Sequence, residues 1–324
     1  MKANVVEKYG TPDVMEFKDV EKPTPKDNEV LVKVHAASIN MADWHLLTAD
    51  IFLVRLEMGL LKPKNKILGA DMAGRVEAVG KNVTQFQPGN EVFGDLARSG
   101  FGSLAEYVAV PEHVLALKPV NLTFEEAAAY PMAAVTALQG LRDQGKLQPG
   151  QKVLIQGASG GVGAFAVQIA KALGAEVTAV CSTRNIELVR SLGADHVIDY
   201  TKEDFTKNGK QYDLILAVNG YHPINDYKRS LTPKGIYVMA GGATKQMFEA
   251  LLRSSFISEK NGRKLGVLTA LPKQEDLVYL KGLTEAGKLK PVIDKRFPLN
   301  EAAQALRYLG EGHARGKVIL TVAS

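Results

Sequence analysis

Four glycines within seven residues constrain this chain more than any other feature of its sequence. They lie in the run GASGGVG at residues 157–163, between an apolar stretch, Lys152 to Gln156, and a segment with apolar residues at helical spacing. This order predicts a strand, a tight turn and an amphipathic helix. Gly174 follows where a left-handed C-cap residue is favoured, and the expected buried face of the helix is formed by Val162, Phe165, Ala166, Ile169 and Leu173.

A glycine-rich turn that leads into a helix favours the binding of a dinucleotide pyrophosphate. The first N–H groups of a helix are unpaired and carry partial positive charge, and glycine lets an anion approach them closely. The spacing is G-x-x-G-x-x-G (Gly157, Gly160, Gly163), and Ser159 occupies the place where the commoner motif has its middle glycine. A turn that serves only the packing of helix on sheet is the alternative interpretation.

The residues after the next strand indicate which dinucleotide binds. NAD enzymes usually place Asp or Glu about 20 residues beyond the glycines to bind the ribose 2'-OH, whereas NADP enzymes supply a cation for the 2'-phosphate. Here the strand Val177 to Cys181 is followed by Ser182 and Arg184, with no carboxylate before Glu187. We therefore predict NADPH as the cofactor. Alternatively, Ser182 caps a helix that begins near Asn185, and Arg184 is a solvated surface charge.

The composition is that of an ordinary globular protein and excludes several classes. The 324 residues suffice for two domains, and the net charge of +5 is scattered rather than clustered, so no nucleic-acid site is predicted. A mildly basic surface favours anionic cofactors and allows peripheral adhesion to an anionic membrane. The single cysteine, Cys181, excludes an intramolecular disulfide and predicts a reducing, cytoplasmic location. No leader peptide or membrane-spanning segment is expected.

The pattern of predicted elements changes near residue 123. Up to about residue 122, alternating segments such as Val30 to Val34 and turns such as Pro88-Gly89 predict a β-barrel or sandwich. A helical run to Leu141 is expected after Thr123, a possible capping residue. The alternating strands and helices that follow predict a doubly wound parallel sheet with right-handed crossovers. Its predicted strands are Lys152–Gln156, Val177–Cys181, His196–Ile198, Leu214–Val218, Ile236–Ala240 and Leu265–Thr269.

The end of the chain is predicted to return to the N-terminal domain. Helices are expected at Glu275 to Ala286 and Asn300 to Leu309, an extended segment at Val292 to Phe297, and a last strand at Lys317 to Val322. The apolar loop Ile51 to Leu61 is predicted to line a pocket for a hydrophobic acceptor. Its apolar side chains are Phe52, Leu53, Leu56, Met58 and Leu60.

Motifs spread over nearly the full length make this chain resemble the medium-chain dehydrogenase/reductase superfamily, specifically its zinc-independent quinone oxidoreductase branch. They are MKANVVEKYG, EVLVKVHAASINMADWH, GADMAG, PGNEVFG, AAVTALQGL, GASGGVG, SLGADHVIDY and GKVIL. Within that branch, CSTRNIELVRSLGAD, VLTALPKQEDL, VIDKRFPL and GHARGKVIL are most similar to the chloroplast-envelope quinone oxidoreductase homologues, a group that reduces α,β-unsaturated carbonyl compounds with NADPH. The resemblance implies an α/β fold with a GroES-like β-barrel catalytic domain (residues 1–122 and 272–324) and a doubly wound Rossmann cofactor domain (residues 123–271).

The resemblance also shows which metal ligands this chain lacks. Zinc-dependent alcohol dehydrogenases of the superfamily have a Cys ligand where this chain has Asn40, a His ligand where it has Ala70, and a third ligand near Pro131 and Met132. The cysteine-rich structural zinc lobe is missing too, because residues 95–103 contain no cysteine. Without a Lewis acid, alcohol oxidation loses its main activation, whereas reduction of a conjugated carbonyl needs only hydride, hydrogen-bond donors and a proton. No metal is therefore predicted.

The same resemblance implies roles for named positions. Asn40 and Thr136 are expected to contact the nicotinamide or the substrate, and they are the candidate catalytic residues. The pyrophosphate turn is expected to consist of Gly157, Ser159, Gly160, Gly161, Val162 and Gly163. Ser182, Arg184 and Tyr200 are expected at the 2'-phosphate, Gly241 and Gly242 at the nicotinamide, and Lys317 near the cofactor.

Several of these positions have a plainer alternative. Asn40 is able to brace a turn, and Thr136 is able to bond the helix carbonyl behind it. Tyr200 is alternatively an ordinary half-buried tyrosine, and Lys317 a solvated lysine.

No acid–base residue stands out in the sequence. Asp43 and Asp71 follow family motifs, but carboxylates that bond backbone at turns are the favoured interpretation. His45 is a candidate proton donor because imidazole titrates near neutrality, and a structural or surface role fits it equally well. The proton is therefore expected from solvent or through the cofactor ribose.

The leading hypothesis is a homodimeric, NADPH-dependent, zinc-independent reductase of hydrophobic enones, enals or quinones. It would act by two-electron hydride transfer or, as some quinone oxidoreductases do, in one-electron steps. A non-catalytic NADPH-binding protein, like some lens crystallins of the superfamily, is one alternative, and a zinc alcohol dehydrogenase is another. The dimer is expected to form through an edge strand near residues 265–269 of the cofactor sheet.

Overall fold

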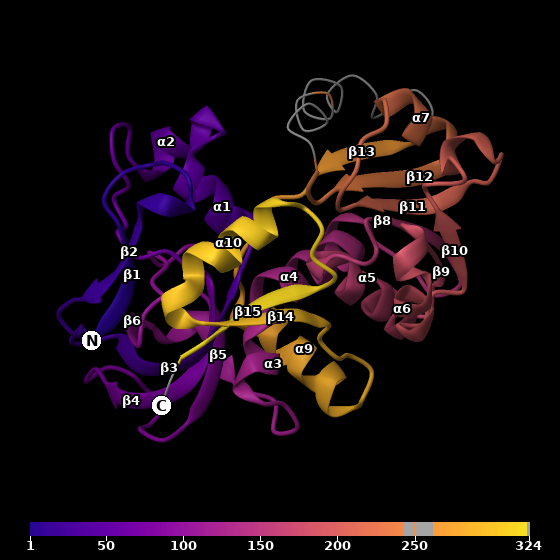
Figure 1. The fold of residues 1–324 in the computed structure, drawn as a ribbon. Helices are drawn as coiled ribbons and strands as arrows, with labels where there is room; N and C mark the ends of the chain where they lie inside the picture. The colour runs from indigo at the N-terminus through magenta and orange to yellow at the C-terminus, as the bar shows by residue number, and fades with distance from the viewer. Residues whose placement is uncertain (243–248, 250–261, 323–324) are drawn as a thin grey trace. The chain divides into compact units, whose positions relative to one another are not determined.

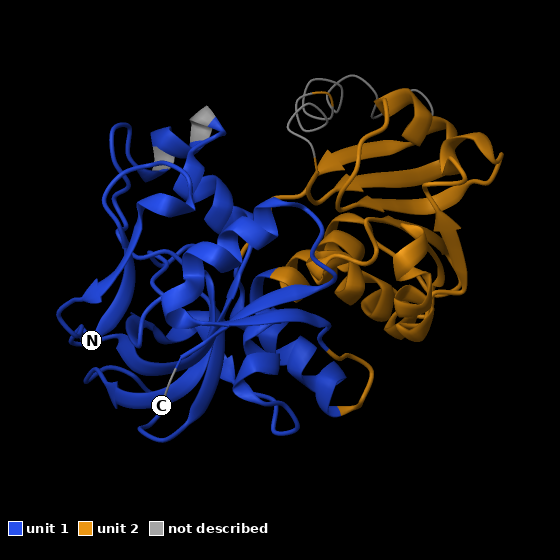
Figure 2. Ribbon diagram, in the orientation of Figure 1, with its two compact units in different colours: residues 1–132, 272–285, 291–324 blue, residues 133–271, 286–290 orange. Residues whose placement is uncertain are grey.

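The computed structural model describes residues 1–242, 249 and 262–322, and the chain divides into two compact units (Figure 1, Figure 2). Unit 1 comprises residues 1–132, 272–285 and 291–324, and unit 2 comprises residues 133–271 and 286–290. Unit 1 continues to residue 132 rather than to 122 because helix α3 (Phe124–Ala128) packs on its sheet. The ring of Phe124 stacks on that of His35 there, with 4.3 Å between the ring centroids.

Unit 1 is built on a seven-stranded sheet in the order β14-β15-β3-β4-β5-β7, with β6 also paired to β3. All of these pairings are antiparallel except that of β14 with β15. Alternate residues of the long strand β3, among them Val30, Val32 and Val34, enter the buried core. The strands are β3 (Glu29–Ile39), β4 (Asp71–Val79), β5 (Glu91–Asp95), β6 (Tyr107–Pro111), β7 (Leu115–Leu117), β14 (Ile293–Pro298) and β15 (Lys317–Thr321), and β1 (Lys2–Val6) pairs separately with β2 (Met15–Asp19).

Two α-helices interrupt the region that the sequence predicts to be all β. The helix α1 (Met41–Thr48) begins where the Asp43 carboxylate accepts the N–H of Asn40 at 2.8 Å, which satisfies one unpaired donor of the helix start. The loop prediction for residues 51–61 is wrong, because this segment contains α2 (Phe52–Met58). Leu56 and Leu60 are more than half exposed and face solvent in unit 1, and the side chains of Phe52 and Leu53 lie outside the described residues. The later helices of unit 1 are α9 (Gln274–Glu285) and α10 (Ala302–Gly310).

The helical run predicted from Phe124 is divided into three pieces. Thr123 caps α3 as predicted, because its hydroxyl oxygen accepts the N–H of Glu126 at 3.2 Å and the Glu126 carboxylate accepts the N–H of Thr123 at 2.8 Å. A new helix, α4 (Pro131–Leu138), starts at Pro131, which has no N–H to continue the first one. A π-helical turn over residues 139–144 follows.

Unit 2 contains the predicted doubly wound sheet. Its parallel strands run in the order β10-β9-β8-β11-β12-β13, and the order reverses beside β8, where ligands of such sheets bind at the carboxyl ends of the strands. Val153, Leu154 and Ile155 of β8 are fully buried, which accounts for the unbroken apolar run. The elements are β8 (Lys152–Gln156), α5 (Gly161–Ala172), β9 (Glu176–Cys181), α6 (Ile186–Ser191), β10 (His196–Asp199), β11 (Tyr212–Ala217), α7 (Ile224–Arg229), β12 (Leu231–Met239) and β13 (Lys264–Val267).

Candidate functional site

The glycine turn of unit 2 joins β8 to α5, and its glycines serve different purposes. Gly157 has a φ of +81°, a conformation that residues with a Cβ rarely adopt. A Cβ on Gly163 would lie 2.1 Å from the Gly157 carbonyl oxygen, so this glycine lets the helix pack closely on the turn. A Cβ on Gly160 would meet no described atom closer than that oxygen at 3.6 Å, so protein packing does not require glycine there. The open space at Gly160 fits the approach of a pyrophosphate to the start of α5.

The predicted nicotinamide glycines lie at the same edge of the sheet as this turn. Gly241 and Gly242 follow β12, which neighbours β11 and is separated by it from β8. A Cβ on Gly241 would lie 2.6 Å from the Val218 carbonyl oxygen just after β11, and Gly242 has a φ of +111°. The carboxyl ends of β8 and β12 are therefore followed by glycines, and backbone without side chains allows a flat ligand to lie close to it.

The three residues predicted at the 2'-phosphate lie around the ends of β9 and β10. Ser182 follows β9, and its hydroxyl oxygen accepts from Asn185 Nδ2 at 3.2 Å instead of capping the next helix. The Tyr200 N–H donates to the Cys181 carbonyl at 3.1 Å, which holds the two strand ends together. Its side chain is 63% exposed, so the interpretation as a half-buried tyrosine is wrong. Arg184 is exposed.

Sequence reasoning missed a carboxylate at this edge. Asp199 ends β10 in register with Cys181 and accepts from the hydroxyl groups of Thr183 at 2.5 Å and Thr201 at 2.7 Å. The bond from Thr183 is the main reason that the pKa of Asp199 lies below its ordinary value, so the carboxylate stays ionised and engaged. Its place at the end of a strand beside β9 is the signal that could have found it.

Unit 1 contains a buried polar cluster centred on Asp71. One carboxylate oxygen, Oδ2, accepts from Ser38 Oγ at 2.8 Å, Asn40 Nδ2 at 3.0 Å and Lys317 Nζ at 3.2 Å. The other, Oδ1, accepts the N–H of Met132 at 2.8 Å. The Asp71 side chain is 0% exposed and that of Lys317 is 4% exposed, so the interpretation of Lys317 as a solvated lysine is wrong. The sheet creates the cluster, because β4 and β15 both pair with the end of β3.

This cluster fixes the amide of Asn40 by both of its polar ends. Lys317 Nζ donates to Asn40 Oδ1 at 2.5 Å, and Asn40 Nδ2 donates to Asp71. A carboxamide has two N–H donors, so one remains for an acceptor on a ligand. Thr136, the other candidate catalytic residue, is 8% exposed in α4 and belongs to unit 2.

The other titratable candidates of unit 1 have structural partners. Asp43 is fully buried and accepts the N–H groups of Asn40 at 2.8 Å and Gly69 at 3.0 Å, which confirms that it bonds backbone. Burial raises the pKa of Asp43 to about 7, and burial, followed by the nearby Asp71, also raises that of Asp95. His45 Nδ1 lies 2.8 Å from Asp50 Oδ1 on the exposed side of α1, which favours a surface role for this histidine.

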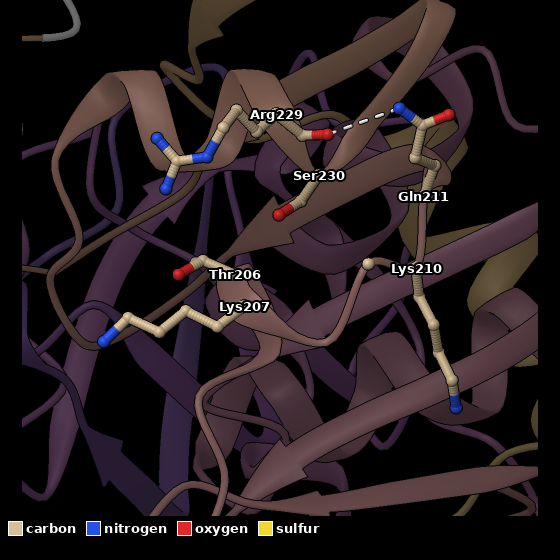
Figure 3. A pocket seen from close by; sticks show the side chains of 7 residues that line it. Thr206, Lys207, Lys210, Gln211, Arg229 and Ser230 are labelled. Carbon is tan, nitrogen blue, oxygen red and sulfur yellow. Dashed lines mark hydrogen bonds between the residues drawn. The ribbon is translucent and has the colours of Figure 1, made fainter.

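One hollow of unit 2 is lined by residues that precede the strands β11 and β12 (Figure 3), at the amino ends of these strands and away from the glycine turn, which follows the carboxyl end of β8. Its volume is about 390 Å³, and residues 206–207, 209–211 and 229–230 line it. Two of its cations are paired with carboxylates, Arg229 with Asp226 at 2.6 Å and Lys207 with Asp204 at 3.3 Å. These pairs reduce its attraction for an anion.

Within residues 1–242, 249 and 262–322, no group of three or more His, Cys, Asp or Glu side chains is arranged to hold a metal ion. No helix in those ranges has the length and apolar character needed to cross a bilayer.

Known proteins resemble this chain over its whole length. Residues 26–120 match the alcohol dehydrogenase GroES-like domain family, and residues 192–320 match the zinc-binding dehydrogenase family. The chloroplast envelope quinone oxidoreductase homolog of Arabidopsis thaliana is 36% identical over 94% of this chain and 93% of its own length. The NADPH-dependent alkenal/one oxidoreductase of the same plant is 34% identical over 99% of this chain and 79% of its own length. The structure of the quinone oxidoreductase from Coxiella burnetii superimposes with a TM-score of 0.87 at 31% identity, covering 100% and 99% of the two chains.

Proposed function

The chain belongs to the medium-chain dehydrogenase/reductase superfamily and is an oxidoreductase, and from this premise we propose that it is an NADPH-dependent, zinc-independent reductase of enones, enals or quinones. The names of its relatives support both acceptor classes, since one is a quinone oxidoreductase homolog and another an alkenal/one oxidoreductase. The acceptor is expected to be hydrophobic.

The observation that carries the choice of cofactor is the end of β9. Ser182 and Arg184 stand where an NAD enzyme would place a carboxylate for the ribose, and the nearby Asp199 is already engaged by threonine hydroxyls. The glycine turn and the start of α5 would hold the pyrophosphate, Ser182 and Arg184 the 2'-phosphate, and Gly241 and Gly242 would allow the nicotinamide to approach. Bound NADPH supplies the hydride.

The side chains of unit 1 at the positions of the zinc ligands support a reaction without zinc. Ala70 has no donor atom, and the oxygen of Asn40 is bonded to the Lys317 ammonium, which is incompatible with metal coordination by that atom. The remaining N–H of Asn40 suits a developing negative charge on an acceptor oxygen, because its amide is held in one orientation before reaction. Thr136 stays a proposed second contact, and the proton is proposed to come from solvent or the cofactor ribose.

A substrate screen with both reduced cofactors tests this proposal. Consumption of NADPH and NADH is followed by absorbance with an enone, an enal and a quinone, with and without a chelator. We expect turnover that prefers NADPH and is unchanged by chelation. Activity that disappears on chelation and returns with zinc would contradict the zinc-independent reaction, and tight NADPH binding without any turnover would favour the non-catalytic alternative. A semiquinone signal under turnover would indicate one-electron steps.

Assembly and location remain predictions of this proposal. Among the described strands, β10 and β13 are the two edges of the six-stranded sheet, and we propose β13 as the edge at which a second copy pairs. Light scattering of the purified protein is expected to give the mass of a homodimer. The cytoplasmic location is tested by fractionation of the source cells.

A further inference from the structure

Asn185 lies between the two serine hydroxyl groups of the proposed cofactor site. It ends the short 3-10 helix η4 (Thr183–Asn185) and is 5% exposed. Its Nδ2 atom lies 2.9 Å from Ser159 Oγ in the glycine turn and 3.2 Å from Ser182 Oγ after β9. One buried amide thus joins the turn that follows β8 to the end of β9, two places that are 26 and 3 residues away from it in sequence.

The amide nitrogen determines which way both hydroxyl groups point. An NH2 group only donates, so both serine oxygens accept from Asn185, and each hydroxyl keeps its own proton for another acceptor. Asn185 Oδ1 is buried and has no hydrogen-bond partner among the described residues. Because an unpaired buried acceptor costs free energy, the contacts of the NH2 group, and not those of the oxygen, account for the position of the side chain.

We propose that Asn185 is a positioning residue that turns the hydroxyl protons of Ser159 and Ser182 toward the phosphate groups of the cofactor. This inference rests on the proposed function, which puts the pyrophosphate beside Ser159 and the 2'-phosphate beside Ser182. Hydroxyl donors that are already oriented bind an anion without a further loss of rotational freedom. Asn185 thereby links recognition of the pyrophosphate to recognition of the 2'-phosphate.

The proposal explains why an amide, and not a carboxylate of the same shape, occupies this position. An Asp side chain only accepts, so it would draw both serine protons toward itself and place a negative charge beside the phosphates. A Leu side chain is neutral and offers no donor, so it removes the orientation without adding charge. Asn185→Leu and Asn185→Asp therefore separate the loss of orientation from electrostatic repulsion.

The test is a double-mutant cycle on cofactor affinity. Dissociation constants for NADP+ and NAD+ are measured by titration calorimetry for the wild type, Asn185→Leu, Ser182→Ala and the double variant, and thermal melting checks that each protein is folded. We expect Asn185→Leu to weaken NADP+ binding about tenfold and NAD+ binding about threefold or less. In the Ser182→Ala background, the same substitution is expected to cost NADP+ binding less than about threefold, because its effect acts through that hydroxyl.

A second double-mutant cycle, with Ser159→Ala, tests the contact of Asn185 with Ser159. It uses NAD+, which has the pyrophosphate but no 2'-phosphate. The losses in that cycle are also expected to be less than additive. If the free-energy losses of the two single variants add up in the double variant of either cycle, Asn185 does not act through that hydroxyl group. The corresponding part of the proposal is then overturned. If Asn185→Leu does not fold, Asn185→Asp replaces it, and NADP+ binding by Asn185→Asp that is as tight as that of the wild type would overturn the proposal. A wild type that binds NAD+ more tightly than NADP+ would instead reject the proposed function, and the inference with it.

Discussion

The two candidate sites of this protein are built in opposite ways. In unit 2, residues 157–163 form a turn of bare backbone, and the polar groups proposed to meet the 2'-phosphate are partly or largely exposed around it. In unit 1, Asn40, Asp71 and Lys317 come from separate strands or strand ends and form a polar cluster with a buried ion pair. A substitution in a site made of exposed donors can change ligand affinity without changing the stability of the fold. A substitution in a buried ion pair changes both.

This difference predicts where substitutions act. Changes in the unit 1 cluster should reduce the free energy of unfolding, because each removed partner leaves a charge or dipole buried without compensation. Changes at the exposed cation of unit 2 should alter cofactor affinity and leave stability nearly unchanged.

The largest effect is expected from Lys317→Met. Removal of the ammonium leaves the fully buried Asp71 carboxylate without its cation, and we expect a loss of about 3–5 kcal/mol in the free energy of unfolding. Urea unfolding measures this loss. The double variant Lys317→Met/Asp71→Asn removes both charges and should recover part of it. A loss below about 1 kcal/mol for Lys317→Met would show that the pair behaves like a surface salt bridge.

A pH dependence of stability is expected from Asp43. Burial raises its pKa from 3.8 to about 7, so the folded protein keeps this proton to a higher pH than the unfolded chain does. The free energy of unfolding therefore falls as pH rises from about 4 to about 7, by at most about 4 kcal/mol from this group, and then levels off. Urea unfolding at about pH 5 and about pH 8 should show a smaller fall in Asp43→Asn, which does not titrate. Part of the fall should remain, because burial also raises the pKa of Asp95.

An equal fall in the wild type and in Asp43→Asn would contradict the raised pKa of Asp43. The free energy of unfolding of Asp43→Asn at a single pH is expected to differ from that of the wild type for another reason. An Asn side chain has one carbonyl oxygen in place of two carboxylate oxygens, so it satisfies the N–H groups of Asn40 and Gly69 less well than Asp43 does.

The same contrast explains how far the sequence predicts each site. The turn of unit 2 is local: its glycines, the strand before it and the helix after it lie within about 20 residues, and their order alone predicts the fold around them. The partners of Asp71 are 31 and 246 residues away, at Asn40 and Lys317. Local patterns carry no information on such pairings, so the family resemblance indicated these positions but not the ion pair between them.

Three features of the structure differ from the sequence-based predictions or go beyond them. The helix α1 was not predicted, because its start depends on the Asp43 carboxylate and an Asp is equally typical of a turn. The long helix predicted from Phe124 is broken at Pro131, although Pro at the first position of a new helix is a known signal. Asn185 was named only as the place where a helix begins, and its role between two hydroxyl groups depends on the strands that bring Ser159 and Ser182 together.

Two glycines of the turn offer a matched pair within one site. Gly163→Ala places a Cβ 2.1 Å from the Gly157 carbonyl oxygen, and we expect a loss of stability of up to about 3 kcal/mol. Gly160→Ala meets nothing closer than 3.6 Å, so its stability should stay within about 0.5 kcal/mol while NADPH binding weakens. Thermal melting and calorimetry measure the two properties. Undiminished NADPH affinity in Gly160→Ala would place the pyrophosphate elsewhere.

The smallest effect on the fold is expected from Arg184→Ala, since Arg184 is exposed. Loss of a charge-assisted contact to the 2'-phosphate should weaken NADPH binding by about 1–3 kcal/mol, or roughly five- to 150-fold, with NADH binding unchanged. Arg190→Ala is the matched control, because Arg190 has the same charge, is 60% exposed on α6 and pairs with Glu187 at 2.8 Å. If Arg184→Ala weakened NADH binding as much as NADPH binding, the contact would involve a group common to both cofactors, and the end of β9 would no longer account for the choice between them.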